Sequence, residues 1–153
     1  MAWQIEIREQ AAQPTLYIRA HAPTEGLPKL IGESFHRIAA YLAELGEGPA
    51  YGPYVCYRSF GPPDIDAELG FPLFAALPGR GDIIAGELPA GPVATCLYRG
   101  PYSEIGAIYQ QMRQWIADHG YEACGYYEYY LNSPDEVPES ELMTRVDMTV
   151  KPK

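Results

Sequence analysis

The sequence has few basic residues, and they form no cluster. It contains 20 acidic residues against 11 lysines and arginines, which gives a formal net charge of -9 at pH 7. Binding to the phosphates of DNA or RNA requires a basic surface, so we expect no direct nucleic-acid partner. The acidic excess favours cationic ligands or basic protein partners, with a purely solubilising role as the alternative.

Cysteine is scarce, and long apolar runs are absent. The three cysteines, Cys56, Cys96 and Cys124, fall in apolar or aromatic segments. Their odd number and irregular spacing argue against a disulfide framework or a zinc site, so we expect buried free thiols and no metal or cofactor. The sequence has neither an N-terminal signal nor an apolar run of membrane-spanning length. We therefore expect a cytoplasmic protein with no membrane contact.

The sequence also offers little for other kinds of chemistry. Ser34 and His36 are two residues apart on a predicted helix, so they do not face each other. No glycine-rich phosphate loop follows a predicted strand. Asp66 and Glu68 alternate along the start of one predicted strand, and Asp64 ends the turn before it. We interpret these acids as a solvated edge strand rather than a cation site.

Tyrosine is the residue in excess, with 13 tyrosines against 4 phenylalanines and 2 tryptophans. Its large ring with a polar hydroxyl suits a binding pocket or an interface. The densest run is GYYEYYL at residues 125–131, whose aromatic composition predicts a strand. Alternation then puts Tyr126, Glu128 and Tyr130 on one face. If that face is buried, Glu128 will be protonated, paired or available to a cation; the alternative is an edge strand with Glu128 in water.

Hydrophobic periodicity divides the chain into two similar halves, at about residues 13–76 and 92–151. The predicted strands are 3–8, 15–20, 53–60, 65–76, 82–88, 93–99, 125–131 and 142–150, and the predicted helices are 27–45 and 103–119. Thr24 and Ser103 are the expected helix caps. We predict a single α+β domain, 1–153, in which tandem β-α-β-β repeats form one antiparallel sheet with two helices on one face and a central pocket.

Alignment of the two halves draws attention to Glu128. When Gly52 is matched to Gly125, Val55 falls on Glu128, so symmetric packing does not require a carboxylate there. Strand parity and this alignment predict the nearest phenols: Tyr57, Tyr126 and Tyr130. Further candidate pocket walls, for which plain core packing is the alternative, are Tyr109, Met112, Trp115 and Phe71.

Several short motifs occur along most of the chain. They are LPAGPVA at 88–94 and YRGPY at 98–102, Trp115-Ile116, EYY at 128–130 before NSP at 132–134, and DAELGFP at 66–72. Together with the repeated β-α-β-β order, they resemble the GyrI-like family, the effector-binding domain also found behind AraC- and MerR-type regulators. The resemblance implies a deep aromatic pocket in which Glu128 meets cationic or electron-poor aromatic ligands. No space for a DNA-binding segment precedes Trp3, so we expect a free-standing member.

The resemblance implies three functions for such a member. The leading hypothesis is a drug- or effector-binding protein for lipophilic aromatic or cationic molecules, with multidrug character. The second is a hydrolase that opens cyclopropane-type electrophilic drugs, with Glu128 and Tyr130 as catalytic residues; no second inward acid is evident from the sequence. The third is a domain that binds a protein partner, such as gyrase or a regulator. The residues do not identify the ligand.

Overall fold

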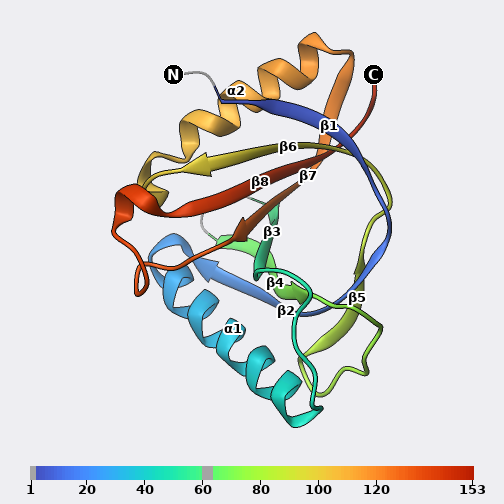
Figure 1. Ribbon diagram of the computed structural model, residues 1–153, viewed down its shortest axis with the longest axis vertical. Coiled ribbons are helices and arrows are strands. Elements are labelled where there is room, and N and C mark those ends of the chain that lie inside the picture. Colours follow the sequence, from blue (N-terminus) through green and yellow to red (C-terminus); the bar gives the residue numbers. More distant parts are fainter. Residues whose placement is uncertain (1–2, 60–63) are drawn as a thin grey trace. The chain divides into compact units, whose positions relative to one another are not determined.

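The chain folds into eight strands and two helices, as described for residues 3–59 and 64–153 by a computed structural model (Figure 1). It divides into two compact units, one of Ala11–Ala90 and one of Met1–Gln10 together with Gly91–Lys153. Within each unit, all neighbouring strands pair antiparallel. The predicted α+β class is therefore confirmed.

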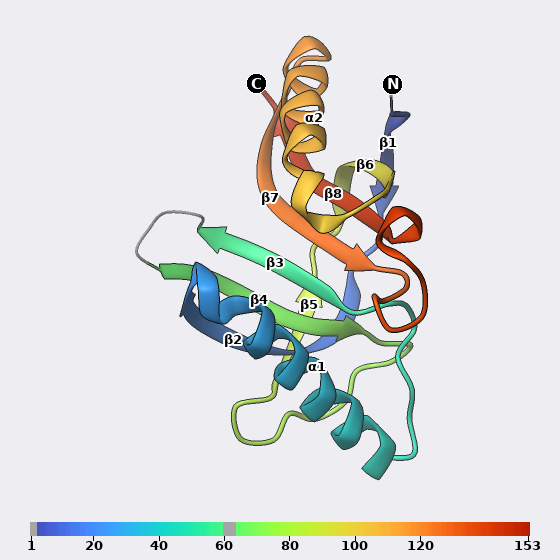
Figure 2. The same cartoon turned by 90° about the vertical axis from the view of Figure 1, so that its left-hand side faces the viewer.

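The unit of residues 11–90 is a four-stranded sheet in the order β3-β4-β2-β5, with one helix. Its elements are β2 (Gln13–Pro23), α1 (Leu27–Glu44), β3 (Tyr54–Ser59), β4 (Asp64–Pro72) and β5 (Ile84–Leu88). Helix α1 lies along this sheet, where it contacts β2 and β4 (Figure 2). Ile38 and Leu42 are one helical turn apart and pack against Leu16 and Ile18 of β2.

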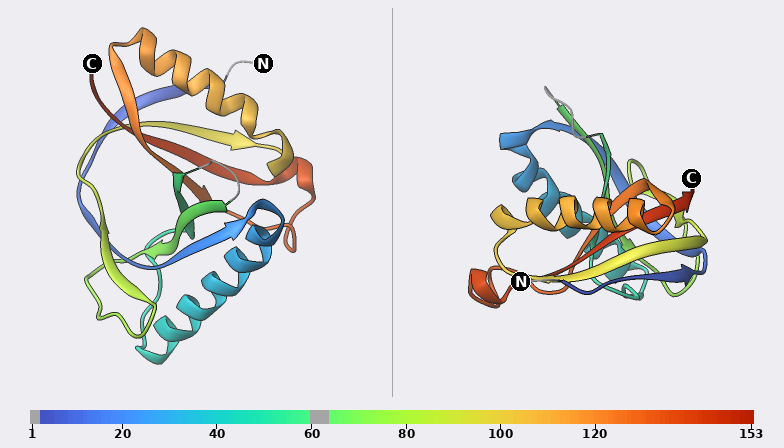
Figure 3. Two further views of the ribbon diagram at one scale, coloured as in Figure 1. Left: turned by 180° about the vertical axis from the view of Figure 1, so that it is seen from behind. Right: turned by 90° about the horizontal axis from the view of Figure 1, so that it is seen from above.

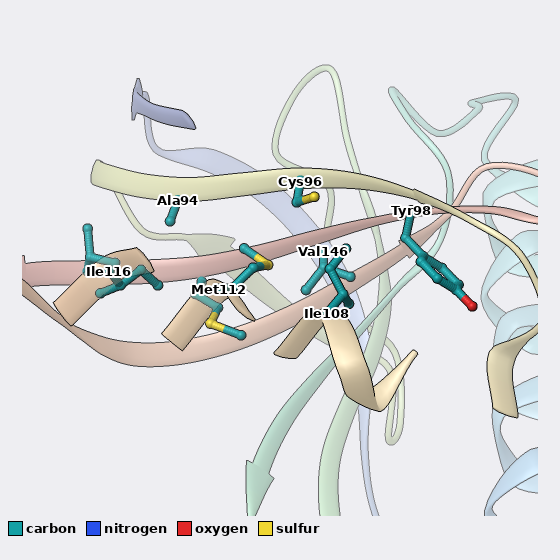
Figure 4. Packing of buried hydrophobic residues seen from close by; sticks show 9 residues of the cluster. Ala94, Cys96, Tyr98, Ile108, Met112, Ile116 and Val146 are labelled. Atoms are coloured by element: carbon teal, nitrogen blue, oxygen red, sulfur yellow. The ribbon is translucent and has the colours of Figure 1, made fainter. Parts of the chain in front are cut away.

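The other unit repeats this arrangement with the order β1-β6-β8-β7. Its elements are β1 (Ile5–Gln10), β6 (Gly91–Arg99), α2 (Gly106–Asp118), β7 (Tyr121–Tyr130) and β8 (Met143–Pro152). Helix α2 contacts β7 and β6 (Figure 3). Ile108, Met112 and Ile116 follow one another at intervals of four residues, so they share one helix face and pack on Val146 and Met148 (Figure 4). This face fixes the position of α2 on its sheet.

Both units contain the order β-α-β-β, as β2-α1-β3-β4 and as β6-α2-β7-β8. Each sheet also has one further strand at the corresponding edge: β5 pairs with β2, and β1 pairs with β6. In the sequence, β1 comes directly before β2, and β5 comes directly before β6; in both cases the second strand belongs to the other unit. Each added strand is therefore the last element of its segment before the chain passes into the other unit. The common order is what a duplication would produce, and the duplication stays a prediction.

The predicted helix caps are wrong. The N-cap positions are Gly26 and Ile105, and neither makes a side-chain capping hydrogen bond. A short 3₁₀ turn precedes each helix, and these turns contain Thr24 and Ser103. The turn lies between the expected cap and the helix. Each helix therefore begins after this turn and not directly after its predicted cap.

The acidic strand β4 is not an edge strand, because it pairs with both β2 and β3. Asp66 binds Arg19 at 2.8 Å and Glu68 binds Arg58 at 2.6 Å. These partners compensate the acids in the sheet interior, so the prediction of a solvated edge is wrong for them. The side chain of Asp64 lies outside the described part of the structure.

Strand boundaries also differ from the predictions, most of all at the end of β4 and the start of β7. Strand β4 ends at Pro72, four residues earlier than expected, and Phe60 at the end of the strand predicted at 53–60 lies outside the described residues. Strand β7 begins at Tyr121 and contains a register shift between Ala123 and Gly125. A Cβ at residue 125 would lie 2.6 Å from Oγ1 of Thr149, so this irregular strand requires glycine there.

The three cysteines do not share one environment. Cys56 and Cys96 are buried free thiols, as predicted. Cys124 lies at the register shift of β7 and is exposed, so the prediction of burial is wrong for it. Its burial was inferred from the aromatic segment around it, and the register shift next to it locally disrupts the pairing of β7 with β8.

Candidate functional site

Glu128 lies on β7 and faces the helix-covered side of its sheet. It is paired with Val146 of β8, and directly paired residues project from the same face of a sheet. Val146 belongs to the core that packs beneath α2. Only 6% of Glu128 is exposed. Of the two alternatives that the sequence left open, a buried face and an edge strand in water, the structure has the buried face.

Two phenols bind the carboxylate of Glu128 from different elements. Tyr130, two residues along β7, donates to Oε1 at 2.7 Å. Tyr109, on α2, donates to Oε2. Each carboxylate oxygen thus has its own donor, and the two donors fix the orientation of the group.

The carboxylate of Glu128 accepts two hydrogen bonds but has no basic partner among the described residues. No lysine, arginine or histidine among the described residues lies within ion-pair distance of its carboxylate. Burial raises the pKa of Glu128, and the hydrogen bonds from Tyr109 and Tyr130 oppose that rise. A buried carboxylate without a basic partner is stabilised more by an incoming cation than a solvated carboxylate is.

Tyr102 is part of this site, although sequence analysis did not select it. It lies in the 3₁₀ turn before α2, and its ring meets that of Tyr130 edge-on at a centroid distance of 5.5 Å. Burial raises the pKa of the Tyr102 phenol, and the nearby charge of Glu128 raises it further. Tyr102 is 37% exposed, so it connects the buried pair to solvent. The signal that could have found it is the YRGPY motif, which ends at this residue.

Tyr126 contacts both Tyr109 and Arg113. Its ring is 6.4 Å from the ring of Tyr109, and the guanidinium of Arg113 lies 5.1 Å from its centroid. Tyr126 is paired with Met148, which places it on the same side of the sheet as Glu128. The unit therefore brings together three of the tyrosines predicted for the site, at 109, 126 and 130.

Of the remaining predicted residues, Met112 and Trp115 belong to the unit of Glu128, and Phe71 and Tyr57 belong to the unit of residues 11–90. Met112 is fully buried in the core under α2, where Figure 4 shows it among other apolar side chains. Trp115 packs on the same core and stacks on His119 at 3.9 Å. Phe71 is buried in the unit of residues 11–90, and Tyr57 is half-buried on β3 of that unit. Core packing, the alternative considered for Met112, Trp115 and Phe71, describes their surroundings.

A second buried acid, Asp147, was missed by the sequence analysis. It is 1% exposed and is paired with Tyr127, so it lies on the face of β8 opposite to Val146. Its carboxylate binds Arg8 at 3.1 Å and Arg145 at 3.2 Å, and it accepts a 2.5 Å hydrogen bond from Thr95. Asp147 is thus neutralised by the fold itself. The sequence feature that could have indicated Asp147 is a single acidic residue within the mainly apolar strand segment VDMTV.

Metal-binding and membrane-spanning features are both lacking in residues 3–59 and 64–153. No group of three or more histidine, cysteine, aspartate or glutamate side chains in these ranges could hold a metal ion. Neither α1 nor α2 has the length and apolar composition of a membrane span.

Known structures share the fold of this chain. The EcmrR C-terminal domain superposes with a TM-score of 0.77 at 20% identity, over 100% of both chains. EcmrR in its complex with DNA gives 0.81 at 21% identity, over 99% of this chain and 58% of that one, so this chain spans little more than half of that relative. No curated protein sequence gives a significant match.

Two other solved structures extend the comparison. A hydrolase from Listeria innocua has a TM-score of 0.69 at 15% identity, over 97% of this chain and 92% of that chain. SAV2435 bound to tetraphenylphosphonium has a TM-score of 0.61 at 10% identity, over 99% and 94%. Identities this low establish a common fold only.

The family is established by the sequence itself. The profile of the GyrI-like small molecule binding domain matches residues 4–151, which is almost the whole chain. The predicted resemblance is confirmed, and the chain belongs to the GyrI-like family of small-molecule-binding domains.

Proposed function

We propose that this protein binds lipophilic aromatic cations and uses Glu128 as the counter-charge. The observation that carries the proposal is a carboxylate with only 6% exposure and two phenol donors but no basic partner among the described residues. A bound cation would supply the missing charge. The phenols hold the carboxylate in place before the ligand arrives, which reduces the ordering cost of binding.

The surrounding rings add a second, smaller source of affinity. Each cation–π contact is worth about 0.5–2 kcal/mol, whereas loss of one partner of a buried charge pair costs about 2–5 kcal/mol. Tyr102, Tyr126 and Tyr130 offer aromatic surface near the carboxylate. We expect the rings to accept many flat or bulky aromatic scaffolds and the carboxylate to select for positive charge.

The comparisons support this assignment. The family is described as a small molecule binding domain, and SAV2435, which has the same fold, has been solved with tetraphenylphosphonium. That ligand is a lipophilic aromatic cation. It is therefore a suitable first probe for this protein, along with other drugs and effectors of the same chemistry.

Isothermal titration calorimetry of the unaltered protein tests the proposal. Tetraphenylphosphonium is compared with triphenylphosphine oxide, a neutral molecule with three phenyl groups on phosphorus instead of four, and with the anion tetraphenylborate, which has four phenyl groups. We expect measurable binding of the cation and, because the charge pair is lost, about 30-fold or more weaker binding of the neutral molecule. Equal affinity for all three compounds would refute a charge-selective site.

A second candidate function, hydrolysis, is favoured by the raised pKa of Glu128. A general base works best when its pKa approaches the pH of the reaction, and burial moves this carboxyl in that direction. Glu128 would take a proton from water while the water oxygen bonds to a cyclopropane carbon. The ring bond would break toward a conjugated carbonyl, and Tyr130 is the candidate proton donor to the product. A Listeria innocua protein of the same fold is described as a hydrolase.

Mass spectrometry separates the two functions. The protein is incubated with a compound that carries an activated cyclopropane, and the hydrated ring-opened product is followed over time. Hydrolysis predicts many turnovers that Glu128→Gln abolishes. Capture of the compound without product supports the binding function alone.

A further inference from the structure

Arg113 differs from the other arginines of this acidic chain. Seven arginines lie at ion-pair distance from a carboxylate: Arg8, Arg19, Arg37, Arg58, Arg80, Arg99 and Arg145. Arg113 has no carboxylate partner among the described residues. Its guanidinium instead lies 5.1 Å from the centroid of the Tyr126 ring. With 20 acidic residues in the sequence, an arginine held on a ring rather than on an acid requires an explanation.

The position of Arg113 relates it to the site of Glu128. It follows Tyr109 by one helical turn of α2, so the two side chains lie on the same helix face. The ring of Tyr126 contacts Arg113 on one side and lies 6.4 Å from the ring of Tyr109, which binds Glu128. Two aromatic rings therefore separate an anionic group at one end from a cationic group at the other.

We infer that Arg113 determines ligand specificity by binding an anionic group, so that the site prefers aromatic zwitterions to simple aromatic cations. This inference rests on the proposed function of Glu128. The positive end of such a ligand pairs with Glu128, its aromatic body lies along Tyr109 and Tyr126, and its carboxylate or sulfonate meets Arg113. A guanidinium suits this role because it binds carboxylates through two parallel hydrogen bonds and also stacks on aromatic rings.

Arg113 has the opposite effect on a ligand without an anionic group. It already occupies a face of Tyr126 that a ligand cation would otherwise use, and like charges repel. Its side chain is exposed, so water and salt weaken both effects. We therefore expect a moderate preference that is strongest at low ionic strength.

The dyes rhodamine 123 and rhodamine 110 provide a matched pair of probes. Both have the same cationic xanthylium rings, but rhodamine 123 is a methyl ester and rhodamine 110 has a free carboxylate. Dissociation constants for both dyes are measured by fluorescence anisotropy with the unaltered protein and with Arg113→Gln. The visible absorption band is recorded in parallel, because the neutral lactone form of rhodamine 110 lacks it.

The ratio of the two dissociation constants is the decisive quantity. Arg113→Gln removes the attraction between Arg113 and the carboxylate of rhodamine 110, and it removes the repulsion between Arg113 and the cationic rings. Because Arg113 is exposed, we expect the substitution to shift this ratio by about two- to fivefold in favour of rhodamine 123. Arg113→Lys keeps the charge without the planar fork and should recover part of the preference. Raising the salt to 0.5 M, about five times the usual ionic strength, should reduce the shift.

Two further variants make the outcome unambiguous. Lys29→Gln removes the same charge from an exposed residue on α1, where Lys29 lies near Glu33, and it should leave the ratio unchanged. Glu128→Gln should weaken binding of both dyes, because both carry the cationic xanthylium rings. If Glu128→Gln weakens them and Arg113→Gln leaves the ratio unaltered, the inference about Arg113 is wrong while the proposed function stands. If Glu128→Gln weakens neither, both fail.

Discussion

The phenol of Tyr130 donates a 2.7 Å hydrogen bond to Oε1 of Glu128 from two positions along the same strand. Strand alternation makes this contact local, because residues i and i+2 project from one face. Tyr109 completes the arrangement from α2 and binds the other oxygen. The hydrogen bonds from the two phenols offset part of the free-energy cost of burying the carboxylate. The predictions for Tyr109, Tyr130 and Glu128 depend on these two opposing effects.

Removal of either hydroxyl should destabilise the protein. In Tyr130→Phe and Tyr109→Phe, one oxygen of a buried carboxylate loses its donor, which costs about 1.5–3 kcal/mol for a hydrogen bond to a charged group. Urea denaturation measures the change. Tyr121→Phe is the matched control on β7, since no hydrogen bond involves its hydroxyl among the described residues, and it should change stability by less than about 0.5 kcal/mol. Equal losses in all three variants would contradict the role of the two phenols.

Glu128 should impose a specific pH dependence on stability. Burial raises its pKa in the folded protein above that in the unfolded chain, so between the two pKa values the folded state binds more protons. The stabilising contribution of Glu128 is then complete below the unfolded pKa and is lost as the pH rises through the folded pKa. The lowered pKa values of Asp66 and Asp82 act in the opposite direction, so the total curve alone is uninformative.

Comparison with Glu128→Gln isolates this effect. The variant retains Asp66 and Asp82 but lacks the titrating group. The free energy of unfolding of the native protein minus that of the variant should decrease between about pH 4 and about pH 8. A difference that stays constant or increases over this range would show that the pKa of Glu128 is not raised.

Asp147 should matter for stability and not for ligand binding. Asp147→Asn keeps the shape of the side chain but removes the negative charge that Arg8 and Arg145 bind. Because these arginines are 36% and 22% exposed, the cost should lie above that of a surface pair and below the about 3–5 kcal/mol of a fully buried one. Glu122→Gln is the control, because its pair with Lys151 joins β7 and β8 at the surface and is worth about 0–1 kcal/mol. Similar effects from both variants in urea denaturation would contradict this account.

The cysteines should differ in reactivity toward a thiol reagent. Burial raises the pKa of Cys96 to about 11, whereas Cys124 is exposed. Thiolates react and thiols do not, so with Ellman's reagent we expect one fast equivalent from Cys124 in the folded protein and the other two only after denaturation. Cys124→Ser should abolish the fast phase. If the fast phase survives, Cys56 or Cys96 is accessible.

Much of the architecture could be predicted because periodicity is a local signal. The apolar residues of α1 and α2 recur at helical spacing, and alternation along β7 correctly grouped Tyr126, Glu128 and Tyr130 on one face. The short motifs and their order along the chain indicated the GyrI-like family, which the profile match confirms. These features depend on residues a few positions apart, and a single sequence contains that information.

The features that the sequence left open or missed depend on contacts that spacing does not encode. Tyr109 could be assigned either to the core or to the pocket, because both fit the same helix face, and only the packing of α2 brings its hydroxyl to Glu128. Asp147 is stabilised by Arg8, which lies 139 residues away along the chain. Cys124 is exposed at the register shift of β7, and the aromatic segment from which its burial was predicted does not show this irregularity.

The most direct test of the central claim is the affinity of Glu128→Gln for tetraphenylphosphonium and for neutral triphenylphosphine oxide. Calorimetry is performed at about pH 8, where the raised pKa of Glu128 still leaves more of its carboxyl ionised than at neutral pH. The account predicts that the substitution weakens binding of the cation by about 2–5 kcal/mol, about 30-fold or more, and changes binding of the neutral compound by less than about threefold. An equal loss for both compounds, or no loss for the cation, would contradict the assignment of Glu128 as the counter-charge.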